Sequence, residues 1–454
     1  MNPLLSHLQP YPFERLRQLF AGVVPPAAYS PISLGMGEPR HPTPQFIKDA
    51  LSNNLSGLAS YPATAGELGL REAFTRWLNL RYAITLDPAT QVLPVNGSRE
   101  ALFSFAQTII DPSKGQPLVV CPNPFYQIYE GAALLAGAAP YYAASDPARN
   151  FAVNWDAVPD SVWQRTQLLF VCSPGNPTGA VMPLTEWKKL FELSDRYGFV
   201  IASDECYSEI YFRDEPPLGG LQAADKLGRS DYKNLISFTS LSKRSNVPGM
   251  RSGFVAGDAA LIKAFLLYRT YHGSAMSPIV QAASIAAWGD EQHVVENRTR
   301  YRKKFAQVTP LLAGVMEVAL PDAGFYLWAK VPEQLAMDDA EFARALLSPP
   351  PLWPLCSVRR PSWPRHPLLP GRWASAPSSP ATTRAGTSAC WPADGAALRW
   401  RPSSSPSCIS ASSSVSPRWA RRCRTPAGPI PLRARRWARG AASSPGCAKT
   451  SNMC

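Results

Sequence analysis

The sequence has few cysteines over most of its length and no long apolar run. Only Cys121, Cys172 and Cys206 precede residue 349, each beside apolar residues, which is typical of small buried thiols in a reducing compartment. With no CxxC pair and no His/Cys cluster, the sequence predicts no metal site. The first 20 residues lack the apolar core of a secretory signal, and no run is long enough to span a membrane. We therefore expect a cytoplasmic protein without a membrane segment.

A basic charge excess is also missing from most of the chain, although the formal net charge is +13. Residues 349–454 hold 15 Arg and one Lys against a single acidic residue, Asp394. The 348 residues before them have 30 basic and 32 acidic side chains and are nearly neutral. Binding to nucleic acid or to an anionic membrane surface is therefore not predicted for this part of the chain.

Residues 1–348 alternate apolar runs with amphipathic segments. The runs predict buried strands and the segments predict helices, which together indicate an α/β fold with a mainly parallel sheet. In this architecture ligands bind beyond the carboxyl ends of the strands. The main expected strands are 32–34, 118–121, 168–171, 199–203, 235–238 and one within 322–330; the main expected helices are 44–55, 185–197, 259–271, 277–288, 291–312 and 338–347.

One stretch, which begins at Ser240, has the composition of a covalent cofactor site. It follows an expected strand and places Lys243 beside two serines, with Arg251 eight residues later. A lysine here can form a Schiff base with an aldehyde cofactor. Ser240, Ser242 and Arg251 can hold a phosphate, the arginine as a two-pronged donor. A surface turn rich in Lys and Ser is the alternative interpretation.

Two further strand ends carry groups suited to a ligand. Gly97 and Ser98 form a strand–turn–helix junction, where we expect Ser98 to be the helix N-cap and the free N–H groups of the helix start to bind a phosphate. Tyr126 follows the strand at 118–121 and could stack on a planar ring. The alternatives are a junction that binds nothing and a tyrosine that packs in the core.

Polar side chains also end the next two strands. Asn176 lies in the sequence SPGNPTG, where two prolines and two glycines hold its amide rigidly. Asp204 closes an apolar run, a place where a carboxylate is costly without a cationic partner, although a helix N-cap is the simpler explanation. Tyr207 lies three residues later, and one helical turn would put its hydroxyl on the same side as Asp204. We therefore expect all the polar residues at the strand ends to lie in one site.

In their order along the chain, these motifs resemble the fold-type I, pyridoxal-phosphate-dependent aminotransferases of the class I/II family. The resemblance covers about residues 31–347 and rests on GEP followed by TP (37–44), Tyr61 with its Gly-Leu-Arg helix, NGS (96–98), SPGNPTG (173–179), SDECY (203–207) and SLSKRSNVPGMRSG (240–253). Residues 2–13 and 37–44 look closer still to the bacterial N-succinyldiaminopimelate aminotransferases of lysine biosynthesis.

The resemblance implies an enzyme that binds pyridoxal 5′-phosphate, with Lys243, Asp204 and Tyr207 as catalytic residues. Lys243 would carry the cofactor as a Schiff base and then move a proton between Cα of the substrate and C4′ of the cofactor. Asp204 would pair with the pyridine nitrogen and keep it protonated. Tyr207 and Asn176 would bind the ring oxygen, and Tyr126 would stack on the ring.

The family pattern also implies how phosphate and substrate are held. The phosphate would be bound by Gly97, Ser98, the Arg99 amide, Ser240, Ser242 and Arg251. Tyr61 would reach the phosphate of a neighbouring subunit, which implies a homodimer. The Gly37 amide would touch the substrate carboxylate, with Tyr126 and Asn176 also beside the substrate.

The resemblance divides the chain into an N-terminal arm with part of the small domain (1–45), a large cofactor-binding domain (46–289), an incomplete small domain (290–348) and a tail outside the family pattern (349–454). In the family, a later strand carries an arginine that clamps the substrate α-carboxylate, and no such context follows Leu347. The tail instead holds 18 Pro, 18 Ser, seven Trp and six Cys. It is either a disordered basic arm or the product of a frameshift in a GC-rich gene, and its Trp and Cys favour the frameshift.

The substrates expected from the subfamily likeness are N-succinyl-LL-2,6-diaminopimelate and 2-oxoglutarate. Two other functions stay open. The chain could be another pyridoxal-phosphate enzyme of the same fold, such as an aspartate or aromatic aminotransferase or a C–S β-lyase, and a lyase would need no acceptor. It could also be a non-catalytic binding module, which would usually carry a DNA-binding domain, whereas no helix-turn-helix precedes residue 31.

Overall fold

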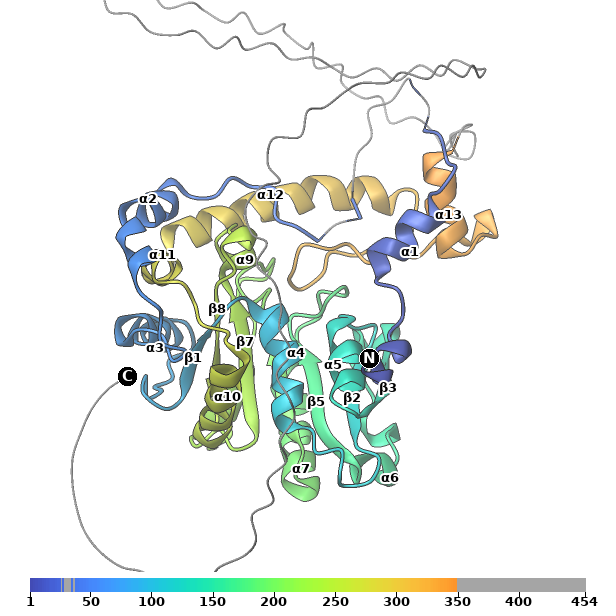
Figure 1. Cartoon of the computed structure of the whole chain (residues 1–454). Helices are drawn as coiled ribbons and strands as arrows, with labels where there is room; N and C mark the ends of the chain where they lie inside the picture. Colours follow the sequence, from blue (N-terminus) through green and yellow to red (C-terminus); the bar gives the residue numbers. More distant parts are fainter. Residues whose placement is uncertain (26, 28–33, 36, 349–454) are drawn as a thin grey trace, which may run out of the picture. The chain divides into compact units, whose positions relative to one another are not determined.

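The computed structural model describes residues 1–25, 27, 34–35 and 37–348 (Figure 1). Most of the strand expected at 32–34, and the whole tail from residue 349, lie outside the described residues. Within the described part, no helix is both long and apolar enough to cross a membrane.

An eight-stranded sheet forms the centre of the fold, in the order β1-β8-β7-β6-β5-β2-β3-β4. The five strands from β7 to β3 in this order are parallel, whereas β8 is antiparallel to both of its neighbours and β4 is antiparallel to β3. The expected α/β fold with a mainly parallel sheet is therefore confirmed. The strands are β1 (Val92–Val95), β2 (Leu118–Asn123), β3 (Ala139–Asp146), β4 (Ala152–Val153), β5 (Thr166–Cys172), β6 (Val200–Asp204), β7 (Leu235–Ser240) and β8 (Gly253–Gly257).

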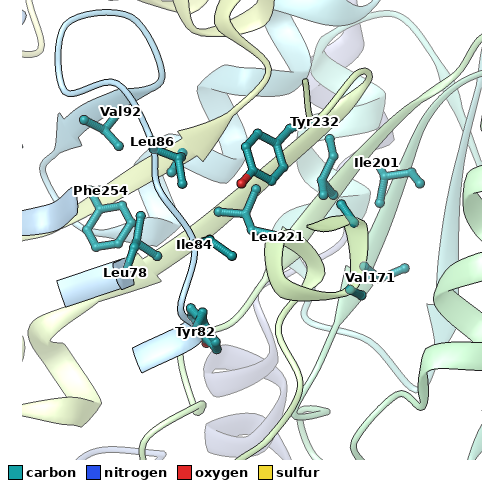
Figure 2. Packing of buried hydrophobic residues seen from close by; sticks show 14 of the residues in the cluster. Leu78, Tyr82, Ile84, Leu86, Val92, Val171, Ile201, Leu221, Tyr232 and Phe254 are labelled. Atoms are coloured by element: carbon teal, nitrogen blue, oxygen red, sulfur yellow. The ribbon is translucent and has the colours of Figure 1, made fainter. Parts of the chain in front are cut away.

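Helices cover both faces of the sheet (Figure 1). Alternate side chains of the central strands enter two hydrophobic clusters, to which α4, α5 and α10 contribute on one face and α3, α7, α8 and α11 on the other. Part of the second cluster is drawn in Figure 2. The α-helices are α1 (Pro12–Leu19), α2 (Gln45–Asn53), α3 (Leu68–Tyr82), α4 (Ser98–Ile109), α5 (Ile128–Leu135), α6 (Asp160–Trp163), α7 (Leu184–Tyr197), α8 (Gly220–Lys226), α9 (Leu241–Arg244), α10 (Ala259–His272), α11 (Pro278–Trp288), α12 (Gln292–Ala313) and α13 (Asp339–Leu347).

Strand β6 illustrates how burial on both faces positions the polar strand ends. Ala202 enters one cluster and Ile201 enters the other, and each is at most 1% exposed. Burying a side chain such as isoleucine contributes roughly 1.5–3 kcal/mol, so the apolar run stays within the sheet. Asp204 is the last residue of β6 and is in register with Cys172 of β5 and Phe238 of β7. The loops that follow three neighbouring strands therefore meet at this edge.

Buried ion pairs tie α12 to the loop that follows β6. The carboxylate of Glu209 accepts hydrogen bonds from Arg81 of α3 (2.7 Å) and from Arg298 of α12 (3.1 Å). Arg302, one turn further along α12, donates to the carbonyl of Tyr211 (3.0 Å). The long helix expected at 291–312 is confirmed, while the four-part division of the chain into domains stays a prediction.

The strand expected within 322–330 is wrong for the described part of the chain. Ala323 makes one isolated bridge to Tyr211, and Lys330 makes one to Glu317. Gly324 has a φ of +83°, a left-handed conformation that interrupts an extended strand. An apolar run becomes a strand only where another backbone pairs along it, and local sequence does not reveal that partner.

Candidate active site

Lys243 lies on the short helix α9, directly after strand β7. Ser240 is the N-cap of this helix and accepts a hydrogen bond from the N–H of Ser242 (3.1 Å), as a residue in that position typically does. The Nζ atom of Lys243 donates to the carbonyl of Gly37 (3.3 Å) and lies 5.8 Å from the ring centroid of Phe325. Burial lowers the pKa of Lys243, which increases the fraction of neutral, nucleophilic amine.

Asp204 is 4% exposed at the end of β6. Its Oδ2 accepts a hydrogen bond from the hydroxyl of Tyr129 (2.9 Å), and its Oδ1 accepts one from the backbone N–H of Cys206 (3.3 Å). The carboxylate therefore accepts from the turn that follows β6 and also faces a buried hydroxyl; the alternative of a helix N-cap is wrong, because a turn and not a helix follows Asp204. Burial raises the pKa of Asp204, and among the described residues it makes no ion pair. A ligand cation at this place would stabilise the ionised carboxylate.

Tyr207 lies at the same edge of the sheet as Asp204. It is 5% exposed, and its hydroxyl lies 2.9 Å from the hydroxyl of Tyr326, where either can donate. Asn176, in the loop after β5, lines a cavity of about 280 Å³ together with Cys172. Since Cys172 is in register with Asp204, the structure brings the loops of Asn176 and Tyr207 to one edge.

The predicted phosphate site lies at the start of α4. Gly97 has a φ of +87°, and a Cβ on it would lie 2.1 Å from Nη2 of Arg251, so the guanidinium rests directly on this glycine. Arg251 also donates to the carbonyl of Pro248 (2.9 Å). A helix start and an arginine that converge on one place form a suitable environment for an anion.

The expectation that Ser98 is the N-cap of α4 is wrong. Gly97 is the N-cap and Ser98 is the first helical residue, because the left-handed turn at the glycine already changes the chain direction. The Ser98 hydroxyl instead accepts a hydrogen bond from the thiol of Cys206 (2.9 Å). The local pattern could not distinguish these neighbouring positions, since both residue types are common helix caps.

Two of the remaining predicted phosphate ligands, Ser240 and Ser242, lie close together and have protein partners of their own, and so does the Arg99 side chain, although the predicted ligand there is the backbone amide. The Ser240 hydroxyl is within hydrogen-bonding distance of the Ser252 carbonyl (3.0 Å) and of the Ser242 hydroxyl (2.9 Å). The Arg99 side chain donates to the hydroxyl of Tyr126 (2.6 Å). Their roles toward a phosphate, and that of Tyr126 toward a ring, stay predictions.

Tyr61 and Gly37 occupy contrasting environments. The side chain of Tyr61 is fully exposed, with a relative accessibility of 103%. Gly37 is next to Lys243 and beneath Tyr326, whose hydroxyl would lie 2.0 Å from a Cβ at this position. Gly37 is therefore part of the assembled site, whereas the described residues of this single chain leave Tyr61 outside it.

Three residues of the site were not predicted from the sequence. They are Tyr129, which donates to Asp204, Tyr326, which contacts Tyr207, and Phe325, which lies beside Lys243. Only Tyr129 had a local signal, because it lies three residues after Tyr126 on the helix that follows β2. Within the described part of the chain, no three His, Cys, Asp or Glu side chains gather closely enough to hold a metal ion.

The site's chemistry fits pyridoxal 5′-phosphate. A buried carboxyl suited to a protonated ring nitrogen lies near Lys243, whose lowered pKa suits an aldehyde. A glycine-lined helix start with Arg251 suits the phosphate.

We expect Gly97→Ala to weaken binding of pyridoxal phosphate by roughly ten- to a hundredfold. The new Cβ would displace the Arg251 guanidinium, and a hydrogen bond to a charged group contributes ~1.5–3 kcal/mol. Gly115→Ala is the matched control, since Gly115 has a φ of +86° but open space around it. Titration of cofactor-free protein measures both dissociation constants. Equal effects of the two variants would show that backbone strain, not Arg251, is responsible.

The family model for class I and II aminotransferases matches residues 29–349. This span agrees with the resemblance over about 31–347, and residues 350–454 lie outside the match. The LL-diaminopimelate aminotransferase of Aquifex aeolicus is 34% identical over 320 residues, which is 70% of this chain and 80% of that protein. The LL-diaminopimelate aminotransferase of Dehalococcoides mccartyi is 33% identical over 322 residues, with the same two coverages of 70% and 80%.

Solved structures agree with these matches. An aminotransferase from Neisseria meningitidis is 56% identical and superposes with a TM-score of 0.74, covering 77% of this chain and 88% of that one. A protein from Thermus thermophilus described as a probable N-succinyldiaminopimelate aminotransferase is 25% identical, with a TM-score of 0.64, and covers 74% of this chain and 88% of that one.

Proposed function

The chain belongs to the class I and II aminotransferases, and we propose that it transfers an amino group between a diaminopimelate-type amino acid and a 2-oxo acid with pyridoxal 5′-phosphate bound at Lys243. The observation that carries the proposal is the convergence of Lys243 and Asp204 at the carboxyl ends of the adjacent strands β7 and β6. Bound there, the cofactor would supply an electron sink for negative charge at the substrate Cα.

Proton transfer, orientation of the ring and binding of the phosphate would then be carried out by residues of the protein. The Nζ atom of Lys243 would take the proton from the substrate Cα and deliver it to C4′ of the cofactor, a task suited to an amine whose pKa is lowered by burial. Asp204 holds a proton on the ring nitrogen through its charge, and Tyr129 keeps the carboxylate oriented by its 2.9 Å hydrogen bond. Tyr207 and Asn176 orient the ring, and Arg251 with the start of α4 fixes the phosphate.

The amino donor we propose is N-succinyl-LL-2,6-diaminopimelate, with 2-oxoglutarate as the acceptor. The motifs at 2–13 and 37–44 and the likeness to the Thermus thermophilus protein support it. Free LL-diaminopimelate is a second candidate, because relatives at 34% and 33% identity carry that name. Both donors contain the same α-amino acid group at the reacting end. They differ at the distal amino group, which is succinylated in the first donor and free in the second.

The test is to measure glutamate formation with each donor and 2-oxoglutarate, and 2-oxo acid formation with the acceptor left out. A higher kcat/KM for the succinylated donor supports the first candidate, and a higher value for the free diamine supports the second. Turnover of a sulfur amino acid without an acceptor would indicate a lyase instead. No turnover of any donor by a frame-restored protein that binds the cofactor would contradict the proposal.

We also propose a homodimer in which Tyr61 reaches the partner's phosphate site. Leu55 and Leu58, close to Tyr61 in sequence, are 57% and 74% exposed, and such apolar exposure is typical of an interface. Sedimentation should give twice the monomer mass, and Tyr61→Phe should weaken cofactor binding only if the dimer forms. The cytoplasmic location expected from the sequence stays a prediction.

Restoring the reading frame after Leu347 is expected to raise kcat/KM by roughly 30- to 5,000-fold. The family's carboxylate-clamping arginine would come from that region, and a buried charge pair of this kind is commonly worth ~2–5 kcal/mol. The visible absorbance of the bound cofactor should appear in both proteins, because the cofactor-binding motifs precede residue 252. Equal kcat/KM in both would show that residues 349–454 are native and that another group binds the carboxylate.

A further inference from the structure

The carboxylate of Asp322 contacts three segments of the chain that lie far apart in sequence. Its side chain is 13% exposed. Its Oδ2 accepts hydrogen bonds from Nδ2 of Asn150 (2.9 Å) and from the N–H of Val181 (3.1 Å), and its Oδ1 forms an ion pair with Arg213. Val181 follows the loop of Asn176, and Arg213 follows the loop of Tyr207. One side chain thus bridges two of the loops that form the candidate site.

The backbone after Asp322 is fixed to the same two loops. The N–H of Ala323 donates to the carbonyl of Gly179 (3.0 Å), and the N–H of Gly324 donates to the carbonyl of Ile210 (2.7 Å). Ala323 is fully buried. A Cβ on Gly179 would lie 2.4 Å from the carbonyl oxygen of Ala323, so the two backbones are in direct contact.

The next two residues enter the site. The hydroxyl of Tyr326 lies 2.9 Å from that of Tyr207 and directly over Gly37. The Phe325 ring contacts Tyr207 edge-on, with its centroid 5.8 Å from Nζ of Lys243. Residues 322–326, which we call the 322–326 segment, therefore run from an anchor outside the site to a hydroxyl within it.

We infer that Asp322 is a positioning residue of this site and that it acts through Tyr326. Because Asp322 fixes the 322–326 segment to two loops at once, it determines where the Tyr326 hydroxyl lies relative to Tyr207 and Gly37. The inference rests on the proposed function, since the ligand positioned there is pyridoxal phosphate with its amino donor. The Arg213 side chain is 53% exposed and screened by solvent, so the two hydrogen bonds to Oδ2 carry most of the effect.

The first experiment uses the full chain without cofactor and measures hydrogen exchange at the amides of Ala323 and Gly324. Asp322→Ala should increase exchange at both amides, and Asp322→Asn, which keeps an oxygen acceptor, should increase it less. Glu333→Gln is the matched control, because it removes an exposed ion pair with Lys330 in the same part of the chain. Unchanged exchange in Asp322→Ala would overturn the inference. If Asp322→Ala fails to fold, the test uses Asp322→Asn, and unchanged exchange at the amides of Ala323 and Gly324 in that variant would overturn the inference.

The second experiment measures the dissociation constant of pyridoxal phosphate and the KM for the amino donor. Asp322→Ala and Tyr326→Phe should each raise the dissociation constant about tenfold, as loss of an outer supporting partner commonly does. The double variant should match the stronger single variant, because the two residues act on one path. Additive effects, or a normal dissociation constant in Asp322→Ala despite faster exchange, would overturn the inference.

The two experiments separate this inference from the proposed function. An unaltered protein that binds no pyridoxal phosphate contradicts the proposed function, while the exchange rates still report whether Asp322 anchors the 322–326 segment. Cofactor binding at Lys243 with unchanged exchange in the Asp322 variants leaves the proposed function intact and rejects the positioning role.

Discussion

Replacing Lys243 by alanine is expected to abolish amino-group transfer. The variant loses both the amine that bonds to the cofactor and the base that moves the Cα proton. General acid–base catalysis alone commonly contributes about 10²–10⁴-fold, and the covalent step is lost in addition. Stopped assays with excess pyridoxal phosphate measure the residual rate, because free cofactor could partly replace the lost attachment.

The attachment itself can be located chemically. Borohydride reduction of the holoenzyme followed by peptide mapping should place the cofactor on Lys243. Lys233 is the internal control, since it lies on the same part of the chain ten residues earlier and is exposed. Cofactor on Lys233, or normal turnover by Lys243→Ala, would refute the assignment.

Asp204→Asn is expected to lower the rate on the order of 10²- to 10⁴-fold while the fold is retained. The asparagine can still accept the hydrogen bond from Tyr129, but it cannot hold a proton on the ring nitrogen by its charge. A lost charge pair in a buried site costs ~3–5 kcal/mol, and each 1.36 kcal/mol corresponds to a factor of ten in rate. Steady-state kcat with saturating cofactor and donor is the measurement.

Glu205→Gln provides the matched control for this variant. Glu205 is the next residue and is equally buried, at 3% exposed against 4% for Asp204. Its carboxylate accepts hydrogen bonds from the N–H of Gly220 (2.9 Å) and from the hydroxyl of Tyr82 (3.4 Å). We expect this variant to keep most of the activity. Near-normal turnover by Asp204→Asn would instead mean that Asp204 serves only as a cap for the turn after β6.

Local sequence was sufficient to place the main chemical groups. The apolar run of β6 must be buried on both faces, so its first charged residue, Asp204, has to lie at the strand end. The same argument applies to Lys243 after β7. Because the carboxyl ends of parallel strands meet at one edge, the order of strands and polar residues along the chain predicted one shared site.

Contacts between distant segments were not predictable in this way. Tyr129 is 75 residues from Asp204 and Tyr326 is 119 residues from Tyr207, and neither separation corresponds to a helical or strand period. The carboxylate of Asp322 accepts hydrogen bonds from Asn150 and Val181, which precede it by 172 and 141 positions. Such contacts depend on how helices and loops pack around the finished sheet.

The sequence by itself therefore determined the α/β sheet, the family and the positions of Lys243 and Asp204, because burial and strand periodicity act on neighbouring residues. Only the tertiary structure decided that Gly97 rather than Ser98 caps α4, that residues 322–330 form no regular strand within the described part, and that Tyr129 and Tyr326 contact residues of the candidate site. The cap follows from the backbone conformation of Gly97, whereas the other two outcomes depend on a partner supplied by a remote segment: a second backbone for a strand, or a hydroxyl for Asp204 and for Tyr207. The local pattern of residues contains no information on where that partner will lie.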